Sequence, residues 1–130
     1  MMNNGFWRLT VRSEFAAAHA LRHYQGKCED LHGHNYSVEM TVEGETLTDD
    51  SELLVDFSVL KSELRAELAL IDHKYLNELP PFDTINPSSE NLARFLYERM
   101  ERRLEGQPIR MHAMTVGETA VQSATYMKVR

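Results

Sequence analysis

Two stretches near the start of the chain alternate hydrophobic and polar residues with a period of two. They run from Phe6 to Ala18 and from Asn35 to Glu45. Such alternation is typical of strands that bury one face. We therefore predict two strands that form an antiparallel ribbon. The alternating apolar positions are Trp7, Leu9 and Val11 in the first stretch and Tyr36, Val38, Met40 and Val42 in the second.

The middle of the chain changes to helical spacing. Asp56 can cap a helix that runs from Phe57 to about Ile71, and this helix would carry Asp72 and His73 at its C-terminal end. Ser88, directly after a proline, can cap a second helix. The apolar stripes of the two helices are Phe57, Leu60, Leu64, Leu68 and Ile71, and then Leu92, Phe95, Leu96, Met100 and Leu104.

The chain closes with two more strand patterns, Ile109 to Val116 and Ala120 to Val129, and Gly117-Glu118-Thr119 is expected to form the turn between them. The order strand, strand, helix, helix, strand, strand predicts an α+β fold, in which a four-stranded antiparallel sheet carries both helices on one face. We expect residues 1–130 to form a single domain. The two open edges of such a sheet favour pairing between subunits in a closed ring.

Composition and charge narrow the choice of protein class. With 42% hydrophobic and 26% charged residues the chain is typical of a soluble globular domain. The net charge of −6 argues against nonspecific nucleic-acid binding. We also expect no membrane segment, because no apolar run approaches the roughly 20 residues that a spanning helix needs. The start of the chain does not resemble a signal peptide, so a cytoplasmic location is expected, where the single cysteine would stay reduced.

The segment KCEDLHGHNY contains the residues most suited to chemistry. His32 and His34 are two residues apart, so both imidazoles point from the same face if the segment is extended. Catalytic zinc usually takes three protein ligands, and His19 in FAAAHAL is the candidate for the third. Cys28 is either a fourth ligand or a reactive group. The alternative is that these histidines are ordinary packed and hydrogen-bonded residues.

Six motifs in a consistent order cover almost the whole chain: FAAAH, GKCEDLHGHNY, LLVDFSVLK, IDHKYLN, NPSSENLA and GET. Together they resemble the 6-pyruvoyl-tetrahydropterin synthase superfamily of tunnelling-fold enzymes. The short spacing in CEDLHGH is most similar to the bacterial 6-carboxy-tetrahydropterin synthases of queuosine biosynthesis. The resemblance implies trimers that close their sheets into a barrel, stacked as a homohexamer with sites at subunit boundaries.

The resemblance also implies the reaction and its metal site. His19, His32 and His34 would hold Zn²⁺, and Cys28 would abstract a proton from the substrate. The substrate would be a pterin triphosphate, 7,8-dihydroneopterin triphosphate, and the products 6-carboxy-5,6,7,8-tetrahydropterin, acetaldehyde and triphosphate. This zinc-dependent lyase would need no nicotinamide or flavin.

Three further residues receive roles from the same resemblance. His73 would be the catalytic histidine, Asp72 would orient it, and Glu118 would bind the aminopyrimidinone edge of the pterin. Without the resemblance, the favoured interpretation of Asp72-His73 is an ordinary helix C-terminus, where the dipole stabilises a histidine. Glu118 taken alone is an ordinary turn residue.

Three functional classes remain open at this point. They are the lyase, a related enzyme with another product such as a pyruvoyl-forming synthase or an aldolase, and a noncatalytic zinc module in which Cys28 completes a closed site. Arg22, Lys27 and Lys74 are candidate cations for the triphosphate. His112 matches no motif and is expected to face solvent.

Overall fold

The computed structural model describes residues 5–24 and 30–129. In chain order the strands and helices are β1 (Trp7–His19), β2 (His32–Gly44), α1 (Phe57–Leu68), β3 (Lys74–Tyr75), the short 3-10 helix η2 (Leu76–Glu78), α2 (Ser89–Arg103), β4 (Arg110–Thr119) and β5 (Gln122–Tyr126). The α+β class is therefore confirmed, whereas several element bounds differ from those predicted.

The sheet has the strand order β3-β1-β2-β4-β5. The four long strands pair antiparallel as predicted, but β3 adds a fifth, parallel strand beside β1 at Ala17 and Ala18. The prediction of a four-stranded antiparallel sheet is wrong in this respect. Two residues are too few to show a periodicity, and backbone and side-chain bonds from Asp72 and His73 to Ala16 hold this segment in place.

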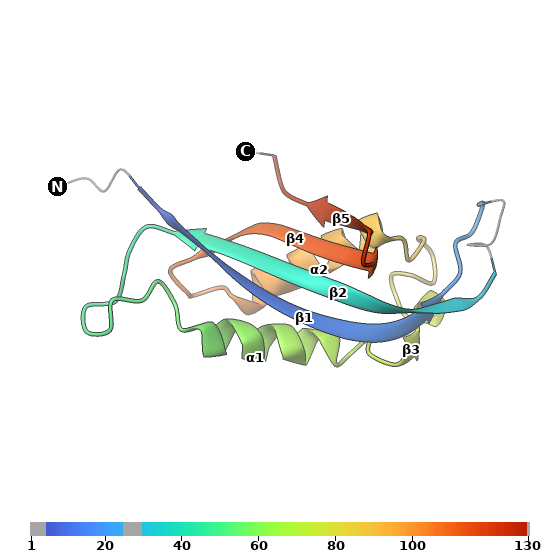
Figure 1. Ribbon diagram of the computed structural model, residues 1–130, viewed down its shortest axis with the longest axis horizontal. Helices are drawn as coiled ribbons and strands as arrows, with labels where there is room; N and C mark the ends of the chain where they lie inside the picture. The colour runs from blue at the N-terminus through green and yellow to red at the C-terminus, as the bar shows by residue number, and fades with distance from the viewer. Residues whose placement is uncertain (1–4, 25–29, 130) are drawn as a thin grey trace.

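Both helices pack on the same face of the sheet. In Figure 1, α1 runs along β1 and α2 passes behind β2 and β4. Leu60, Leu64 and Leu68 of α1 share one buried core with Leu92 and Leu96 of α2 and with the inward residues of the strands. Apart from Trp7, which is exposed, the inward residues follow the predicted alternation. They include Val11, Phe15, Ala17, Tyr36, Val38, Met40, Val42, Met114 and Val116.

The helix starts follow the predicted caps, but the first helix ends early. The Asp56 carboxylate accepts from Ser58 N, and the Ser88 hydroxyl accepts from Asn91 N. Instead of continuing to Ile71, α1 ends at Leu68, and the chain turns before Asp72. Asp72 and His73 thus belong to the connection to β3 and do not continue the helix.

Strand β2 begins earlier and β4 ends later than expected. Because β2 starts at His32, both candidate histidines lie within the strand. Strand β4 continues through Thr119, so the predicted turn at Gly117-Glu118-Thr119 is wrong. Gly117 pairs with Ser37, and a Cβ at Gly117 would collide with the Ser37 hydroxyl, which explains why this close approach uses glycine.

Buried carboxylates tie elements together away from the histidines. Glu67 of α1, which is 1% exposed, accepts from Arg99 and Arg103 of α2 at 3.0 and 2.7 Å. Glu43 of β2 binds two arginines in the same manner, and His112 Nδ1 lies 3.7 Å from its carboxylate. His112 is therefore part of a charged cluster and does not simply face solvent.

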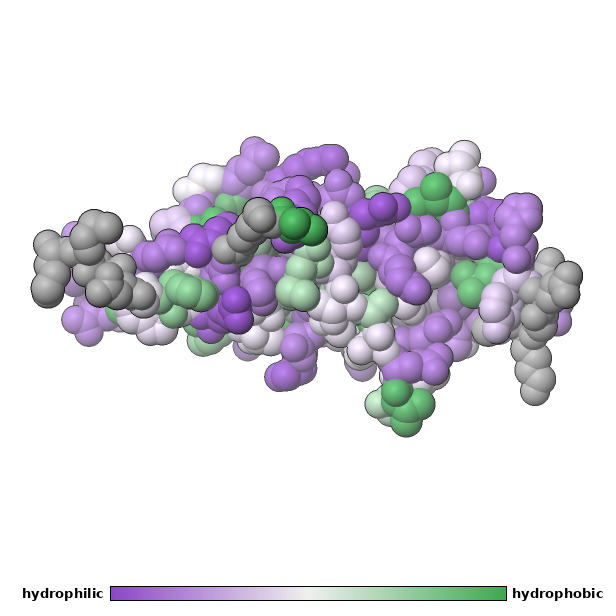
Figure 2. Space-filling view, turned by 90° about the horizontal axis from the view of Figure 1, so that it is seen from above, coloured by the Kyte–Doolittle hydropathy of each residue, from purple (hydrophilic) through white to green (hydrophobic). Residues whose placement is uncertain are grey.

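The surface carries no broad apolar face in the view from above. Hydrophilic residues cover most of it, and apolar residues form small separate groups (Figure 2). Within the described part of the chain, no helix is both long and apolar enough to cross a bilayer.

Candidate functional site

Strand pairing assembles a cluster of histidines at one end of the β1–β2 ribbon. His19 and His32 are direct cross-strand partners, and His34 follows His32 on the same face of β2. This face packs toward the helices, so His19 is fully buried, whereas the side chain of His34 is 21% exposed. The predicted convergence of the three imidazoles is therefore present.

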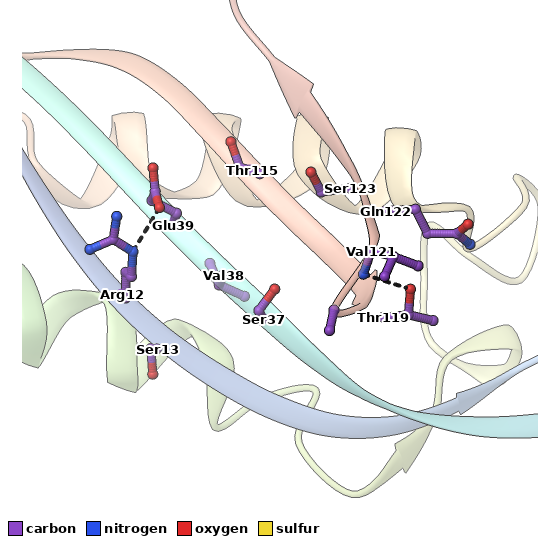
Figure 3. Close-up of a pocket in the computed structure, with 11 residues that line it drawn as sticks. Arg12, Ser13, Ser37, Val38, Glu39, Thr115, Thr119, Val121, Gln122 and Ser123 are labelled. Atoms are coloured by element: carbon purple, nitrogen blue, oxygen red, sulfur yellow. Dashed lines mark hydrogen bonds and ion pairs between the residues drawn. The ribbon is translucent and has the colours of Figure 1, made fainter.

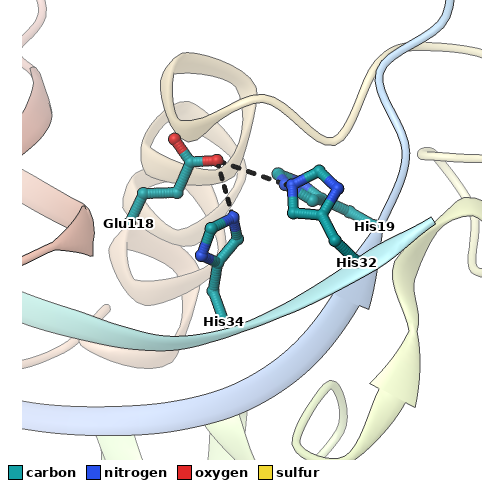
Figure 4. A group of neighbouring side chains, drawn as sticks. All are labelled: His19, His32, His34 and Glu118. Carbon is teal, nitrogen blue, oxygen red and sulfur yellow. Dashed lines mark hydrogen bonds and ion pairs between the residues drawn. The ribbon is translucent and has the colours of Figure 1, made fainter. Parts of the chain in front are cut away.

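Glu118 of β4 completes this cluster. Its Oε1 lies 3.2 Å from His19 Nε2 and 3.1 Å from His34 Nε2. The Nε2 atoms of His19 and His32 are 2.9 Å apart. Figure 4 shows the three rings and the carboxylate converging on one point, and their ligand atoms all lie within 4.8 Å of one another.

Glu118 follows Met114 and Val116 on the inward face of β4 and lies at a β-bulge. Gly117 pairs with Ser123 and Thr119 pairs with Gln122, so β4 carries one residue more than β5 between these pairs. Bulges bend a strand and change the direction of side chains, and they are frequent beside active sites. In this chain the bulge coincides with the residue whose carboxylate reaches the histidines.

Backbone carbonyls set the tautomers of two of the rings. His19 Nδ1 lies 2.8 Å from the Pro87 oxygen, and His32 Nδ1 lies 2.7 Å from the Asp30 oxygen. A carbonyl can only accept, so each Nδ1 must carry the proton and each neutral ring has its lone pair on Nε2. Those lone pairs face each other and the Glu118 carboxylate.

Such a group of converging acceptors fits a metal ion. Lone pairs at these distances repel unless a cation or an additional proton lies among them. In a tetrahedral site with zinc–nitrogen bonds of about 2.0–2.1 Å, the ligand atoms are separated by about 3.3–3.4 Å. The separations of 2.9, 3.1 and 3.2 Å are within a few tenths of an ångström of that value. His19, His32, His34 and Glu118 could therefore hold a metal.

Burial and the neighbouring histidines keep the His19 ring in the neutral form that can bind a metal. Burial lowers the pKa of His19, and the neighbouring His32 and His34 act in the same direction. Because neutral imidazole is the form that binds a metal, His19 keeps its lone pair to a lower pH than an exposed histidine does. Burial, with the charge of Glu118, also raises the pKa of Tyr36.

Asp72 and His73 form the predicted pair. Asp72 Oδ2 lies 3.0 Å from His73 Nδ1, and Asp72 Oδ1 accepts from Ala16 N at 2.9 Å. The bond from Ala16 is the main reason that the pKa of Asp72 is lowered, and His73 adds to it. His73 has φ +60, a backbone conformation that histidine rarely adopts, and its side chain is 80% exposed.

The pair is not beside the histidine cluster. His73 lines cavities with Glu14, Ala16 and Asn35, whose side chains alternate to the face of the ribbon opposite His34. The larger cavity has a volume of about 480 Å³. It is lined by Ala16, Ala17, Ala18, Gly33, His34, Asn35, His73, Lys74 and Tyr75. His34 borders this cavity too, but Glu14, Ala16 and Asn35 lie on the outer face, so within one subunit the sheet separates the dyad from the inward imidazoles of the histidine cluster.

A separate cavity of about 470 Å³ lies on the outer face of the sheet, away from His73 (Figure 3). Its charged residues, Arg12 and Glu39, are paired with each other at 2.8 Å. Since these charges satisfy each other and the histidines lie on the opposite face, this cavity is a poorer candidate for the reaction. The remaining lining residues are Ser13, Ser37, Val38, Thr115, Thr119, Ala120, Val121, Gln122 and Ser123.

The predicted proton-transfer cysteine and the candidate triphosphate-binding cations differ in what the structure shows of them. Cys28 and Lys27 lie outside the described residues, so their predicted roles stay predictions. The guanidinium of Arg22 donates to the carbonyls of residues 77, 82 and 85 and is part of the scaffold. Lys74 is exposed and lines the cavity beside His73, where it remains a candidate cation.

Sequence reasoning missed the side chains that support the cluster. The amides of Asn77 and Asn86 each make two hydrogen bonds, to the backbone of Ala20 and of Arg22 respectively. They fix the chain directly after His19, next to the segment that supplies the Pro87 carbonyl. Both asparagines lie in the motifs IDHKYLN and NPSSENLA, but nothing in the sequence alone assigns them this contact.

Comparisons with known proteins agree with the geometry. A family profile described as 6-pyruvoyl tetrahydropterin synthase matches residues 8–129. The 6-carboxy-5,6,7,8-tetrahydropterin synthase of Synechocystis is 35% identical over 95% of both chains. The dihydroneopterin monophosphate aldolase of Pyrococcus furiosus is also 35% identical, over 76% of this chain and 79% of its own. The structure of Caenorhabditis elegans 6-pyruvoyl tetrahydropterin synthase superposes with a TM-score of 0.85 at 26% identity, covering 99% of this chain and all of that one.

Proposed function

The chain belongs to the 6-pyruvoyl tetrahydropterin synthase family, and from this premise we propose that it is a zinc-dependent 6-carboxytetrahydropterin synthase of queuosine biosynthesis. Its substrates are 7,8-dihydroneopterin triphosphate and water, and its products are 6-carboxy-5,6,7,8-tetrahydropterin, acetaldehyde and triphosphate. The observation that carries the proposal is the convergence of three histidine Nε2 atoms at one end of the sheet. The Synechocystis relative, similar over nearly the whole chain, supports this choice of product.

The reaction balances without an external oxidant or reductant. The side chain is cleaved between its first and second carbons, and the first carbon becomes a carboxylate that takes an oxygen from water. The electrons released in this oxidation reduce the dihydropterin ring to the tetrahydro state. Loss of triphosphate from the remaining two carbons gives acetaldehyde.

His19, His32 and His34 would hold the zinc, which would act as a Lewis acid on the hydroxyl groups of the substrate side chain. His19 and His32 are prepared for this role because the carbonyls of Pro87 and Asp30 direct their Nε2 lone pairs toward the cluster. The buried position of His19 also excludes water from this side of the site.

Proton transfer is assigned to Cys28 and His73. Asp72 accepts the Nδ1 proton of His73, which leaves His73 Nε2 as the proton acceptor that faces the substrate. Cys28, four residues before His32 in the sequence, is proposed as the group that removes a proton from the side-chain carbons.

Glu118 is proposed to bind the pterin ring. Its carboxylate can accept two parallel N–H bonds from the aminopyrimidinone edge. A small cavity of about 170 Å³ adjoins Glu118 and provides polar walls from Ser89, Gln122 and Ser123. In the metal-loaded protein the Glu118 carboxylate would thus give up its contacts with His19 and His34 and bind the pterin ring instead.

The position of the Asp72–His73 pair implies an assembled enzyme. Because the sheet separates this pair from the histidines of its own subunit, we propose that it serves the metal site of a neighbouring subunit. This agrees with a homohexamer built as a dimer of trimers, with active sites at subunit boundaries.

Two alternatives each have an observation in their favour. The Pyrococcus relative is named an aldolase, so another product from a related pterin is the second candidate. The contacts of Glu118 with His19 and His34 favour a form of the third candidate in which Glu118, in place of Cys28, is the fourth protein donor of a closed, noncatalytic metal site.

Mass spectrometry of the products separates these candidates. Purified protein is loaded with zinc and incubated with 7,8-dihydroneopterin triphosphate, and the His32→Ala variant serves as the control. A carboxypterin together with acetaldehyde supports the lyase. A pyruvoyl pterin, or a pterin with a shortened side chain and no carboxylate, supports the second candidate. Zinc-loaded protein without turnover supports the third candidate.

A further inference from the structure

The ring of His19 is held on its Nδ1 side by two buried groups. The Pro87 carbonyl oxygen lies 2.8 Å from Nδ1, and the Tyr36 hydroxyl oxygen lies 3.0 Å from the same atom. Tyr36 is fully buried and Pro87 is buried as well. No bulk water can replace either partner, so both contacts bear directly on the orientation of the ring.

The direction of these hydrogen bonds follows from the carbonyl. If Nδ1 carried the lone pair, it would face the Pro87 oxygen at 2.8 Å with two acceptors opposed. Nδ1 must therefore carry the proton, and the Tyr36 oxygen acts as its second acceptor. The lone pair of His19 is left on Nε2, on the side of His32 and Glu118.

Both acceptors are themselves fixed by the fold. The Tyr36 ring stacks on Phe15 of the neighbouring strand, with centroids 4.7 Å apart and planes 10° apart. Around Pro87, the Asn86 side chain binds the backbone of Arg22, and the Asn86 carbonyl accepts from the Asn91 side chain at 2.9 Å. The His19 ring thus lies between two rigid partners.

The other two histidines are held less firmly. His32 has one acceptor, the Asp30 carbonyl, at an exposed position. Among the described residues, none forms a hydrogen bond with either ring nitrogen of His34, and its buried Nε2 lies 3.1 Å from the Glu118 carboxylate. The three ligands therefore differ in preorganisation, and His19 has the most.

We propose that Tyr36, together with the Pro87 carbonyl, is a positioning element that locks His19 as the preorganised ligand of the metal site. This inference rests on the metal site of the proposed function. Outer hydrogen-bond partners of this kind fix the tautomer and orientation of metal-binding histidines, and their removal typically weakens metal binding by roughly 10- to 100-fold.

Tyr36→Phe tests the proposal, because it removes the hydroxyl and keeps the ring that stacks on Phe15. Tyr97→Phe is the matched control: Tyr97 is 3% exposed, and its hydroxyl donates to the Met111 carbonyl elsewhere in the core. Zn²⁺ affinity is measured by competition with a chromogenic chelator. We expect a roughly tenfold loss for Tyr36→Phe and an affinity close to that of the wild type for Tyr97→Phe.

A second measurement does not need metal. Long-range proton–nitrogen NMR of the metal-free protein reports which ring nitrogen of His19 is protonated, and Nδ1–H is expected. A His19 Nδ1 that carries no proton would overturn the proposal, as would equal metal affinity of Tyr36→Phe and wild type, or an equal loss in both variants. If the wild type bound no Zn²⁺, the proposed function would fail, whereas the NMR result would still decide the tautomer.

Discussion

His19 and His32 form the last cross-strand pair of the β1–β2 ribbon, and their Nε2 atoms lie 2.9 Å apart. Neither ring can turn away without losing its hydrogen bond to a backbone carbonyl. The ribbon thus fixes two candidate ligand atoms, and His34, on the same face, supplies the third candidate. The consequences for metal binding, for pH and for catalysis can be tested separately.

His32→Ala should lose the metal. Three imidazoles are expected to bind about one zinc per subunit, and the loss of one nitrogen ligand leaves an incomplete site. Metal analysis of the purified variant by mass spectrometry measures this directly. The control is His23→Asn, because His23 is exposed and has φ +62, which asparagine tolerates. Full zinc retention by His32→Ala would remove His32 from the ligand set.

The metal-free protein should lose stability as the pH falls below about 6.5, the ordinary pKa of histidine. Burial lowers the pKa of His19 in the folded state, so below this pH the unfolded chain binds more protons than the folded one. One such proton changes the free energy of unfolding by at most about 1.4 kcal/mol per pH unit. Urea denaturation between pH 8 and pH 5 measures the slope.

His19→Gln is the comparison for this pH dependence. Glutamine does not titrate, so the variant should have a shallower slope between the ordinary histidine pKa and the lowered pKa of His19. An unchanged slope would show that other groups dominate the effect.

Much of this fold could be predicted from the pattern of the sequence. The alternation around Val38 and Met40 predicted a strand with one buried face, and Asp56 and Ser88 were correctly predicted as helix caps. Strand β3 could not be predicted, because its two residues carry no period. It depends instead on two hydrogen bonds between residues far apart in the sequence, from Ala16 N to Asp72 Oδ1 and from His73 N to the Ala16 carbonyl.

The candidate site was also only partly predictable. The spacing of His32 and His34 implied a common face, and the structure confirms it. Glu118 was expected in a turn, but β4 continues through it, and its carboxylate reaches the histidines because β4 pairs with β2, which no single segment reveals. The supports from Pro87 and Tyr36 are likewise tertiary contacts, although both residues lie in motifs that the sequence singled out.

Asp72→Asn should fold and bind metal but lose turnover. The asparagine oxygen can still accept from Ala16 N, but the amide N–H₂ would face His73 Nδ1 and favour the wrong tautomer of that ring. A positioned acid–base group typically contributes roughly 100- to 10,000-fold to the rate, so kcat should fall within that range. Steady-state kinetics and metal analysis measure the two effects.

Asp50→Asn is the control for this substitution. Asp50 is exposed and accepts from Ser51 N, a contact that asparagine can reproduce. Equal kcat in Asp72→Asn and Asp50→Asn would contradict the role of the Asp72–His73 pair.

Cys28→Ala should keep its zinc and lose most of its turnover. The thiol is assigned to proton transfer, for which a loss of roughly 100- to 10,000-fold is typical. Metal content and kcat are measured on the same preparation. Loss of zinc in this variant would instead make Cys28 a ligand and favour the noncatalytic metal module.

Mixing two inactive variants should restore activity if the enzyme works as an assembly. His32→Ala removes the metal ligand and His73→Ala removes the proton acceptor, so neither homogeneous protein should turn over. Since the sheet separates these two residues within a subunit, each active site should combine the histidines of one subunit with the Asp72–His73 pair of another. After the subunits exchange in an equal mixture, about one site in four should contain both intact halves. Sedimentation identifies the mixed oligomer, and each variant exchanged with itself is the control. If activity does not return although mixed oligomers form, the pair acts within its own subunit and the proposed arrangement of the site at the subunit boundary is wrong.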